Sequence, residues 1–386
     1  MRSACLLQFL AEIAPIHLIV FAEEGAPDPR EALPSGLAAR CDTVWLPVHR
    51  KDFVSKCTRN LNRLVRGRPP LFDRFSTSES RRRVAELIQG ERYSLAVVEH
   101  FWCADYLSAI RPNTNQIVLD LHNIESALHE TCAATEPFPQ SWAHRRFAEH
   151  SRRLEEKLLP NYDLVLVPSK TDGDKVRAVA SGVETAIVPN AIPLTSPAPA
   201  AEREMIAFSG NLEYHPNVTA VRYFASEVWP ELRRRFPNLV WRLIGKNESA
   251  FRALAASDPR IELSGPVDDA LAELSQARVV VAPILAGSGT RVKIMEAWAA
   301  TRPVVSTPIG AEGLPYQEGR NLFLAENPKR WLEQTSRLLE DEPLRRTLGE
   351  NGRTTFEQHC CWPAAWRALD EALTLPRSGV TAGEAV

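Results

Sequence analysis

The stretch that decides the fold is residues 279–307, VVVAPILAGSGTRVKIMEAWAATRPVVST. It predicts a buried strand at Val279–Pro283, a glycine-rich turn at Gly287–Gly289 and a helix that begins directly behind the turn. A second strand, PVVST, follows once Thr301–Pro303 has ended the helix. A strand, a glycine turn and a helix N-terminus aim backbone N–H groups at one point, where the helix dipole favours an anion.

Charged side chains in this helix extend the prediction to a nucleotide diphosphate. Arg291 and Lys293 place two cations within about the first turn, where they favour a phosphate and suit a diphosphate well. Lys293 and Glu296 are three residues apart and therefore share a helix face. A carboxylate one turn beyond the phosphate is well placed to accept hydrogen bonds from ribose hydroxyls. The alternative for the two cations is a solvated helix face.

The segment resembles the donor-binding signature of the retaining glycosyltransferases of family four, also called glycosyl transferases group 1, which have the GT-B architecture. Four further segments fit that family: FSGNLEYHPN at 208–217, LIGK at 243–246, ELSGPVDD at 262–269 and GAEGL at 310–314. IVPNAI at 187–192 stands where the family enters its interdomain linker. The resemblance covers nearly the whole chain and is strongest over about 205–325.

An α/β fold of two domains follows from the residues and from the resemblance together. Short apolar runs alternate with amphipathic segments in both halves, which predicts βαβ units and two parallel sheets. GT-B architecture implies two Rossmann-like domains that face each other across a cleft, with ligand in that cleft and a C-terminal helix that crosses back. We expect an N-terminal acceptor-side domain at 1–192, a linker at 193–204 and a nucleotide-sugar-binding domain at 205–357. A crossover helix at 358–376 and a disordered tail at 377–386 should follow.

The expected elements follow from the same apolar periodicities. Strands are expected at 16–21, 43–48, 94–99, 116–121, 163–167, 205–209, 239–244, 260–263, 278–282, 303–306 and 321–324. Helices are expected at 51–66, 78–89, 142–159, 344–358 and 362–373. We also expect a helix, rather than a signal peptide, ahead of the first of these strands, because Glu12 interrupts the apolar run.

Family members begin with a strand and a Gly-rich loop ahead of their first helix, whereas this chain begins at about that helix. We therefore expect the N-terminal sheet to lack a central strand, which would leave neighbouring strands with unpaired backbone groups. Two explanations stay open. Either the true start codon lies upstream, or the protein is a degenerate, inactive copy.

Composition excludes several classes of function. The 386 residues carry a formal net charge of −2 and show no apolar run long enough to span a membrane, so neither nucleic acid nor a membrane-spanning role is indicated. The seven cysteines are odd in number and show no CxxC pair, which argues for a reducing, cytoplasmic setting and against a zinc site. They are Cys5, Cys41, Cys57, Cys103, Cys132, Cys360 and Cys361.

The resemblance implies that a sugar moves from a nucleotide-diphosphate donor to an acceptor hydroxyl with retained configuration, and without a metal or other cofactor. It assigns the diphosphate to the backbone amides of Gly289 and Thr290 and to the side chains of Arg291 and Lys293. Glu296 matches the second glutamate of the wider family's E-x7-E pair and would hold the ribose.

Four further residues are expected to contact the donor. Ser288 stands where the first glutamate of that pair would be, so Ser288 and its neighbour Gly287 are candidates to meet the sugar instead. The wider family also carries an Arg and a Lys after the first strand of its second domain, and this chain has neither there. Gly210 and Asn211 would then approach the donor through their backbone.

Two histidines end predicted strands of the first half, His100 in AVVEH and His122 in VLDLHNIES. The family has a histidine at the position that His122 matches, where it contacts the donor sugar or assists the acceptor. His122 and Asn123 are the stronger candidates, with a hydrogen-bonded structural histidine as the alternative. His100 and Glu99 are weaker candidates for acceptor or sugar contacts. Asp120 and Glu125 are expected to orient these groups or to cap a helix.

Residues 51–83 carry a run of basic side chains with leucine and phenylalanine between them. Such a segment suits anionic lipid headgroups at the inner face of the plasma membrane, where lipid-linked acceptors lie. A solvated helix face with a loop explains the pattern equally well. The basic residues are Lys51, Lys56, Arg59, Arg63, Arg66, Arg68, Arg74, Arg81, Arg82 and Arg83.

The leading hypothesis is a retaining hexosyltransferase that acts in cell-surface or exopolysaccharide biosynthesis on a glycan or lipid-linked acceptor. The alternative is a catalytically inactive GT-B relative that binds a nucleotide or a partner protein. A sugar-nucleotide epimerase is disfavoured because those enzymes lack the glycine-turn helix described above. A dinucleotide oxidoreductase is disfavoured because no G-x-G-x-x-G follows the first strand.

Overall fold

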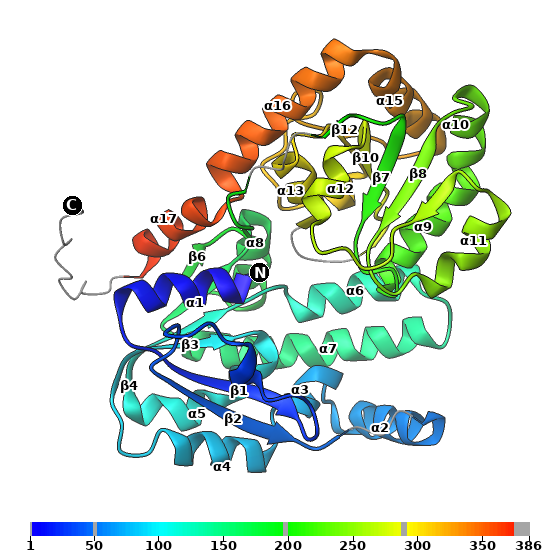
Figure 1. The fold of residues 1–386 in the computed structure, drawn as a ribbon. Helices are drawn as coiled ribbons and strands as arrows, with labels where there is room; N and C mark the ends of the chain where they lie inside the picture. The colour runs from blue at the N-terminus through cyan, green and yellow to red at the C-terminus, as the bar shows by residue number, and fades with distance from the viewer. Residues whose placement is uncertain (1, 49–51, 196–199, 287–291, 374–386) are drawn as a thin grey trace, which may run out of the picture. The chain divides into compact units, whose positions relative to one another are not determined.

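The computed structural model describes residues 2–48, 52–195, 200–286 and 292–373 (Figure 1). The chain divides into two compact units, Met1–Val188 with Trp366–Val386 and Pro189–Ala365. Within the described ranges, none of the helices combines the length and the apolar character that crossing a membrane requires. None of the six cysteines in these ranges whose side chains are described is in a disulfide.

The first unit alternates helices with short parallel strands. Its strands are β1 (His17–Glu23), β2 (Arg40–Leu46), β3 (Tyr93–Glu99), β4 (Thr114–Asp120), β5 (Leu164–Val167) and β6 (Thr185–Ile187). Its α-helices are α1 (Arg2–Ile13), α2 (Phe53–Arg66), α3 (Pro70–Phe75), α4 (Ser78–Leu87), α5 (Leu107–Ile110), α6 (Glu125–Thr135), α7 (Gln140–Leu158) and α8 (Lys170–Val179). Short 3-10 helices are η1 (Pro29–Ala32), η2 (Phe101–Tyr106), η3 (Arg111–Asn113) and η4 (Leu159–Asn161).

The main sheet of this unit, β3-β4-β5-β6, is parallel and buried on both faces. Alternate residues of β4 and β5 point to opposite sides, as the two-residue period of a strand requires. One face packs among its own helices through Ile117 and Leu119. The other face packs through Val118 against α1 and the last helix, α17 (Trp362–Ala372), which contributes Leu369. The end of the chain therefore packs beside its beginning, on one side of this sheet.

The remaining strands of the first unit form a separate two-stranded parallel sheet, β1-β2. Val44 of β2 packs against Val84 and Leu87 of α4. Among the described residues, β1 pairs only with β2 and β3 pairs only with β4, so each of them keeps one edge that no described strand covers. The described part of the first unit thus holds two parallel sheets, where the sequence predicted one.

The second unit holds one six-stranded parallel sheet in the order β12-β11-β10-β7-β8-β9. Its strands are β7 (Met205–Ser209), β8 (Val240–Ile244), β9 (Ile261–Leu263), β10 (Val279–Ala282), β11 (Val304–Ser306) and β12 (Phe323–Leu324). Its helices are α9 (His215–Glu227), α10 (Trp229–Arg235), η5 (Glu248–Phe251), α11 (Arg252–Ser257), α12 (Ala270–Ser275), α13 (Val292–Ala299), α14 (Pro308–Ala311), α15 (Pro328–Glu340) and α16 (Glu342–His359). Chain order reverses between β7 and β10, and ligands of such sheets bind at the carboxyl ends of the strands beside this reversal.

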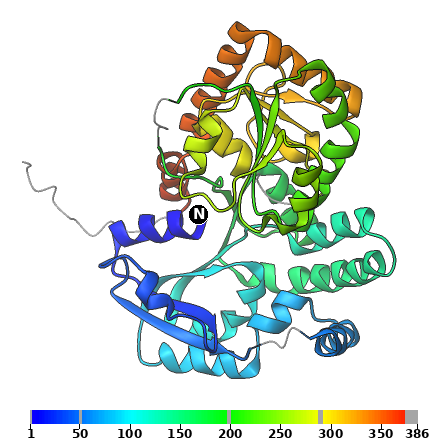
Figure 2. The same cartoon turned by 45° about the vertical axis from the view of Figure 1, so that its right-hand side comes forward.

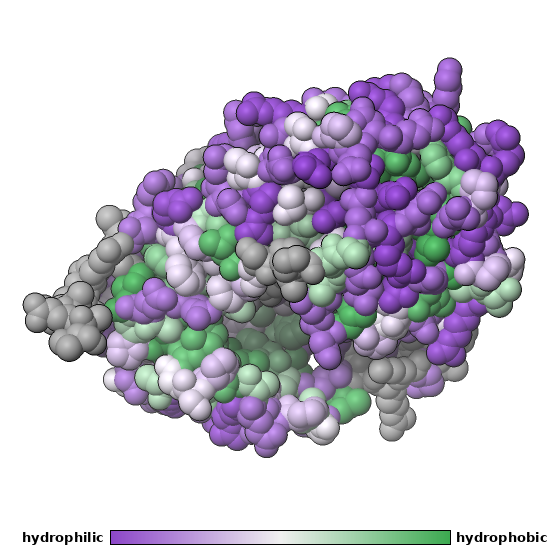
Figure 3. All heavy atoms as spheres, turned by 45° about the horizontal axis from the view of Figure 1, so that its top comes forward, coloured by the Kyte–Doolittle hydropathy of each residue, from purple (hydrophilic) through white to green (hydrophobic). Residues whose placement is uncertain are grey.

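Helices cover both faces of this sheet (Figure 2), and large apolar side chains pack against each face. Phe224 of α9 and Trp331 of α15 lie edge-on at 5.5 Å between ring centroids, in a cluster with Trp241 of β8. Trp298 of α13 fills the opposite face with Phe356 of α16. The surface seen in Figure 3 is hydrophilic over most of its area, so the apolar residues are used mainly inside the units.

The limits predicted from the sequence agree with the structure to within three residues for every expected strand and helix. The predicted break between the last two helices is also present, since α16 ends at His359 and α17 begins at Trp362. The sequence did not predict β6 or α6. The tail over 377–386, and residues 196–199 of the predicted linker, lie outside the described residues.

Candidate functional site

The carboxyl end of β7 is shaped by two glycines. Gly210 follows Ser209 with φ +147°, and a Cβ there would lie 2.8 Å from Asn217 Nδ2 and 3.3 Å from Lys293 Nζ. Gly245 follows β8, also with φ +147°, and a Cβ there would lie 1.9 Å from the Gly210 carbonyl oxygen. Both positions therefore require glycine, and together they bring the ends of the two strands close to each other.

Lys293 is the second residue of α13, and its ammonium is held beside Gly210. Nζ donates to Asn217 Oδ1 at 2.7 Å and lies 3.9 Å from the centroid of the Phe208 ring. Asn217 is itself fixed, because its Nδ2 donates to the Asn211 carbonyl at 2.8 Å. The amide oxygen and the aromatic face together fix the position of the ammonium. The arrangement presents a positioned cation at the strand ends where an anion is expected.

Glu296 lies one turn further along α13 and is largely buried. Its Oε2 accepts a hydrogen bond from Ser209 Oγ at 3.1 Å. Burial raises the pKa of this carboxyl, and the Ser209 hydrogen bond and the Lys293 charge offset only part of that rise. Lys293 lies beside Gly210 and Glu296 bonds to Ser209, so both side chains reach the end of β7. This agrees with the prediction that they share one face of the helix.

Other predicted donor contacts are only partly described. Five of these residues lie outside the described residues, so their predicted contacts stay predictions. They are Gly287, Ser288, Gly289, Thr290 and Arg291.

Asn211, in contrast, is described, and its side chain is engaged within the turn. Its Oδ1 accepts from the Glu213 amide and from Asn247 Nδ2, both at 3.1 Å. This leaves the backbone as the part of Asn211 that is suited to approach a ligand.

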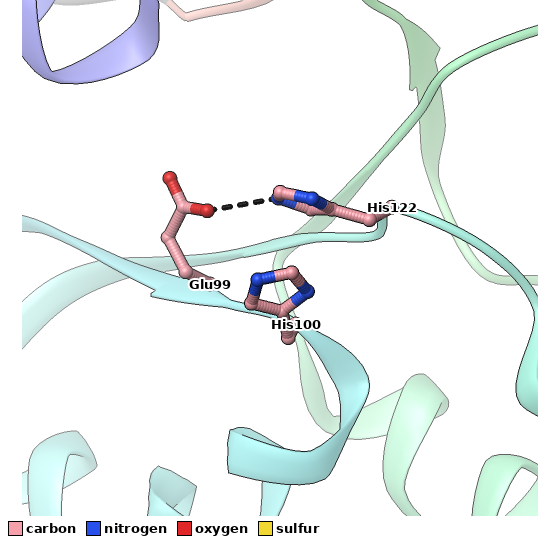
Figure 4. Close-up of side chains that lie close together, drawn as sticks. All are labelled: Glu99, His100 and His122. Atoms are coloured by element: carbon pink, nitrogen blue, oxygen red, sulfur yellow. Dashed lines mark hydrogen bonds and ion pairs between the residues drawn. The ribbon is translucent and has the colours of Figure 1, made fainter. Parts of the chain in front are cut away.

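A second constellation lies in the first unit, at the carboxyl ends of β3 and β4. His122 Nε2 lies 2.9 Å from Glu99 Oε2 and 3.5 Å from Asp120 Oδ2 (Figure 4). Ser3 Oγ donates to the same Glu99 oxygen at 2.6 Å. Arg2 Nε donates to both Asp120 oxygens at 2.9 Å. The first two described residues of α1 thus hold the two carboxylates that face His122.

These contacts determine the charges in the constellation. Burial alone would lower the pKa of His122, but its hydrogen bonds to Asp120 and Glu99 outweigh burial and raise it. Burial alone would raise the pKa of Asp120, but Arg2 and His122 outweigh it and lower that pKa. These contacts favour the protonated form of His122 between two carboxylates, with Arg2 as a second cation beside Asp120.

His100 adds a neutral ring to this imidazolium. Its ring centroid lies 3.7 Å from that of His122, and it stacks on Trp102 at 4.0 Å. Burial, and secondarily the charge of His122, lower the pKa of His100 to about 4. Within the described ranges, no hydrogen-bond partner reaches its buried Nδ1. Its backbone has φ +67°, a strained conformation that non-glycine residues adopt mostly at functional sites.

Asn123 is turned toward Glu125 rather than toward His122. Its Nδ2 donates to Glu125 Oε1 at 3.0 Å. Burial raises the pKa of Glu125 to about 7, although the Asn123 hydrogen bond acts against that rise. Glu125 is the first residue of α6, whose N-terminus has no side-chain cap, so Glu125 holds the Asn123 amide rather than capping the helix.

Two groups among the described residues offer several metal-binding atoms within 4.8 Å of one another. One is Glu99, His100 and His122, in which the carboxylate and the His122 imidazole already bond to each other. The other is Cys132, Glu136 and His144, at the α6–α7 turn.

Sequence reasoning missed three residues that organise these constellations: Asn217, Ser209 and Arg2. Asn217 and Ser209 lie in FSGNLEYHPN, which matched the family as a whole, but nothing marked either side chain as a partner for α13. Arg2 is the only basic residue of the helix Arg2–Ile13, and this single cation was the available signal.

Comparisons with known proteins agree with this fold. The family model of the glycosyl transferases group 1 matches residues 203–341. An uncharacterised 44.6 kDa protein in the cps region of Klebsiella pneumoniae is 22% identical over 262 residues, 64% of this chain and 66% of that protein. Sucrose-phosphate synthase from Thermosynechococcus elongatus superposes with a TM-score of 0.68 at 18% identity, over 95% of this chain and 90% of that one.

Anabaena Alr3699/HepE, in complex with UDP and glucose, superposes with a TM-score of 0.61 at 15% identity, over 96% of this chain and 95% of that one. These structural matches extend over both units, and the family match contains Gly210, Asn217, Lys293 and Glu296. Residues 203–341 therefore form a domain of the glycosyl transferases group 1, in a chain that has the GT-B fold of glycosyltransferases.

Proposed function

We propose that this chain transfers a hexose from a nucleotide-diphosphate sugar to a hydroxyl of a glycan or lipid-linked acceptor, with retention of configuration. The observation that carries the proposal is Lys293, whose ammonium is fixed by Asn217 beside Gly210 at the carboxyl end of β7. A positioned cation next to exposed backbone, beside the reversal in strand order, suits a diphosphate.

In the proposed reaction the bond between the sugar C1 and the diphosphate oxygen breaks while the acceptor oxygen bonds to C1 on the same face. The acceptor proton passes to the departing phosphate oxygen, so no separate general base is needed. Negative charge develops on the leaving diphosphate, where Lys293 and Arg291 stabilise it most strongly in the transition state. Glu296 accepts hydrogen bonds from the ribose hydroxyls.

The constellation of the first unit supplies contacts to the transferred sugar or to the acceptor. His122, held by Glu99 and with its pKa raised, donates a hydrogen bond to an oxygen of the sugar. His100, whose pKa is lowered to about 4, is the neutral ring packed beside it.

UDP is the nucleotide we propose first, because Alr3699/HepE is described in complex with UDP and glucose. A role in surface or exopolysaccharide synthesis is supported by the relative in the cps region of Klebsiella pneumoniae. Both statements concern relatives of low identity, and for this chain they define the substrates to test.

We also propose that residues 51–83 place the enzyme at the inner face of the plasma membrane. Leu61 and Val65 of α2 are 63% and 79% exposed, which suits contact with lipid. Arg63 does not contribute to such a surface, because its guanidinium pairs with Asp73 at 3.0 Å. Arg66, an exposed residue at the end of α2, stays a candidate for headgroup contacts.

The test measures binding and turnover separately. Calorimetry with UDP, GDP and ADP identifies the nucleotide, and release of labelled sugar from the matching donor reports catalysis. We expect one nucleotide to bind, with binding weakened in Lys293→Met. In His122→Phe, turnover should be lost while nucleotide binding persists. Nucleotide binding with no turnover of any sugar or acceptor would instead favour the catalytically inactive relative.

A further inference from the structure

Residues 129–144 bring together four side chains that the proposed reaction does not use. His129, Cys132 and Glu136 follow one another at spacings of three and four residues, which places them on one face of α6 and its C-terminal end. His144 of α7 faces them. Both views show α6 and α7 lying side by side (Figures 1 and 2).

The donor atoms in this group are close and partly shielded from water. Atoms of Cys132, Glu136 and His144 all lie within 4.8 Å of one another. His144 Nε2 is 3.7 Å from Glu136 Oε2, and these side chains are 26% and 16% exposed. The other nitrogen of His144, Nδ1, lies 2.9 Å from His129 Nδ1. Two ring nitrogens at this distance share one proton in a hydrogen bond.

Thiolate, imidazole and carboxylate are the ligands that zinc prefers in proteins, at metal–ligand distances of about 2.0–2.3 Å. Tetrahedral geometry at those bond lengths separates ligand atoms by about 3.3–3.8 Å. The Glu136–His144 pair already has this separation. Binding of an ion therefore requires the ligand atoms to move closer by on the order of 1 Å, mainly the sulfur of Cys132.

We propose that Cys132, Glu136 and His144 bind one zinc ion, with water as the fourth ligand. The ion sits on His144 Nε2, and Nδ1–H then donates to His129. A metal-bound histidine commonly donates its second N–H to a neighbouring acceptor in this way, which fixes its tautomer and orientation. Binding requires that Cys132 loses its proton, which is released to solvent.

A zinc ion here would join the end of α6 to α7 across the turn between them. An ion that binds only the folded chain stabilises it by mass action, whatever its effect on catalysis. This inference departs from the expectation drawn from the cysteine spacing, because a helix face brings donors together without any CxxC pair.

The test uses the full chain, stripped of metal with a chelator and titrated with Co²⁺, whose thiolate complexes have a charge-transfer band in the near ultraviolet. We expect one equivalent of Co²⁺ with that band, displaced by Zn²⁺, and a higher melting temperature with Zn²⁺. Cys132→Ser should lose the band and the stabilisation. His144→Gln should weaken Zn²⁺ binding at least tenfold. Cys41→Ser, a half-buried cysteine of the same unit, is the matched control and should keep both.

Two results would overturn the proposal. One is the same thiolate band in folded Cys132→Ser and Cys132→Ala, because the sulfur would then come from another residue. The other is Co²⁺ binding without a thiolate band, or no binding at all. The cluster of Glu99, His100 and His122 offers no sulfur, so an ion bound there would be recognised by this second result.

Discussion

Replacement of Lys293 by methionine tests the donor site most directly. The change removes the ammonium but keeps an unbranched side chain of similar length over Phe208. It deletes a 2.7 Å hydrogen bond to Asn217 and the positive charge 3.9 Å above the ring. The fold should tolerate it, because methionine packs well against aromatic rings.

The expected loss falls on diphosphate binding. A hydrogen bond to a charged group contributes about 1.5–3 kcal/mol. At about 1.4 kcal/mol per factor of ten, UDP should bind Lys293→Met roughly 10- to 150-fold more weakly than wild type. Uridine lacks the diphosphate, so its affinity should be unchanged by the substitution.

Calorimetric titration with UDP and with uridine gives both affinities. Lys329→Met is the matched control, since Lys329 is an exposed lysine near the start of α15 in the same unit. It should bind UDP as wild type does. The assignment is refuted if folded Lys293→Met binds UDP within twofold of wild type. It is also refuted if uridine affinity falls as much as UDP affinity, because the loss would then have no connection with the phosphates.

Three further outcomes follow from the same contacts. Asn217→Ala should weaken UDP binding roughly 2- to 10-fold in calorimetry, since it removes a hydrogen bond that orients the ammonium but makes no contact with the diphosphate itself. Gly245→Ala should lower the free energy of unfolding by about 3 kcal/mol or more in urea melts, because its Cβ would lie 1.9 Å from the Gly210 carbonyl oxygen. Gly36→Ala, at positive φ in open space, should cost only about 1 kcal/mol. His100 has a pKa of about 4 in the folded chain and about 6.5 in the unfolded chain, so the unfolded chain takes up a proton first as the pH falls. The free energy of unfolding should therefore fall by at most about 3 kcal/mol between pH 6.5 and pH 4. In His100→Phe this fall should be smaller.

The fold was predictable because parallel strands are short apolar runs with recognisable ends. The strand over Met205–Ser209 is predicted with its observed limits, since a buried run meets a glycine that no other residue can replace. β6 was missed because three residues, Thr185–Ile187, carry too little periodicity to be distinguished from a loop. The helix α6 was missed for a related reason, since its apolar residues form no regular stripe.

Residue identity in the site was predictable, but its contacts were not. Lys293 and Glu296 could be assigned from one motif, because charge and helix spacing are local properties of the sequence. The partner of Lys293 could not, since Asn217 lies 76 residues away and meets it only through the order of strands in the sheet. The same holds for His144 and Cys132, which come together through the pairing of two helices rather than through a sequence pattern.

Arg2 shows how a contact between residues far apart in the sequence affects the pKa values of the histidines in the first unit. Its guanidinium pairs with Asp120, 118 residues away, and keeps that buried carboxyl ionised. The ionised Asp120 then helps to raise the pKa of His122, and the charged His122 contributes to the lowering of the pKa of His100. A cation on α1 therefore helps to set the difference in pKa between two neighbouring imidazoles. The protonation of this pair in the proposed reaction thus depends on a helix that carries none of the catalytic groups.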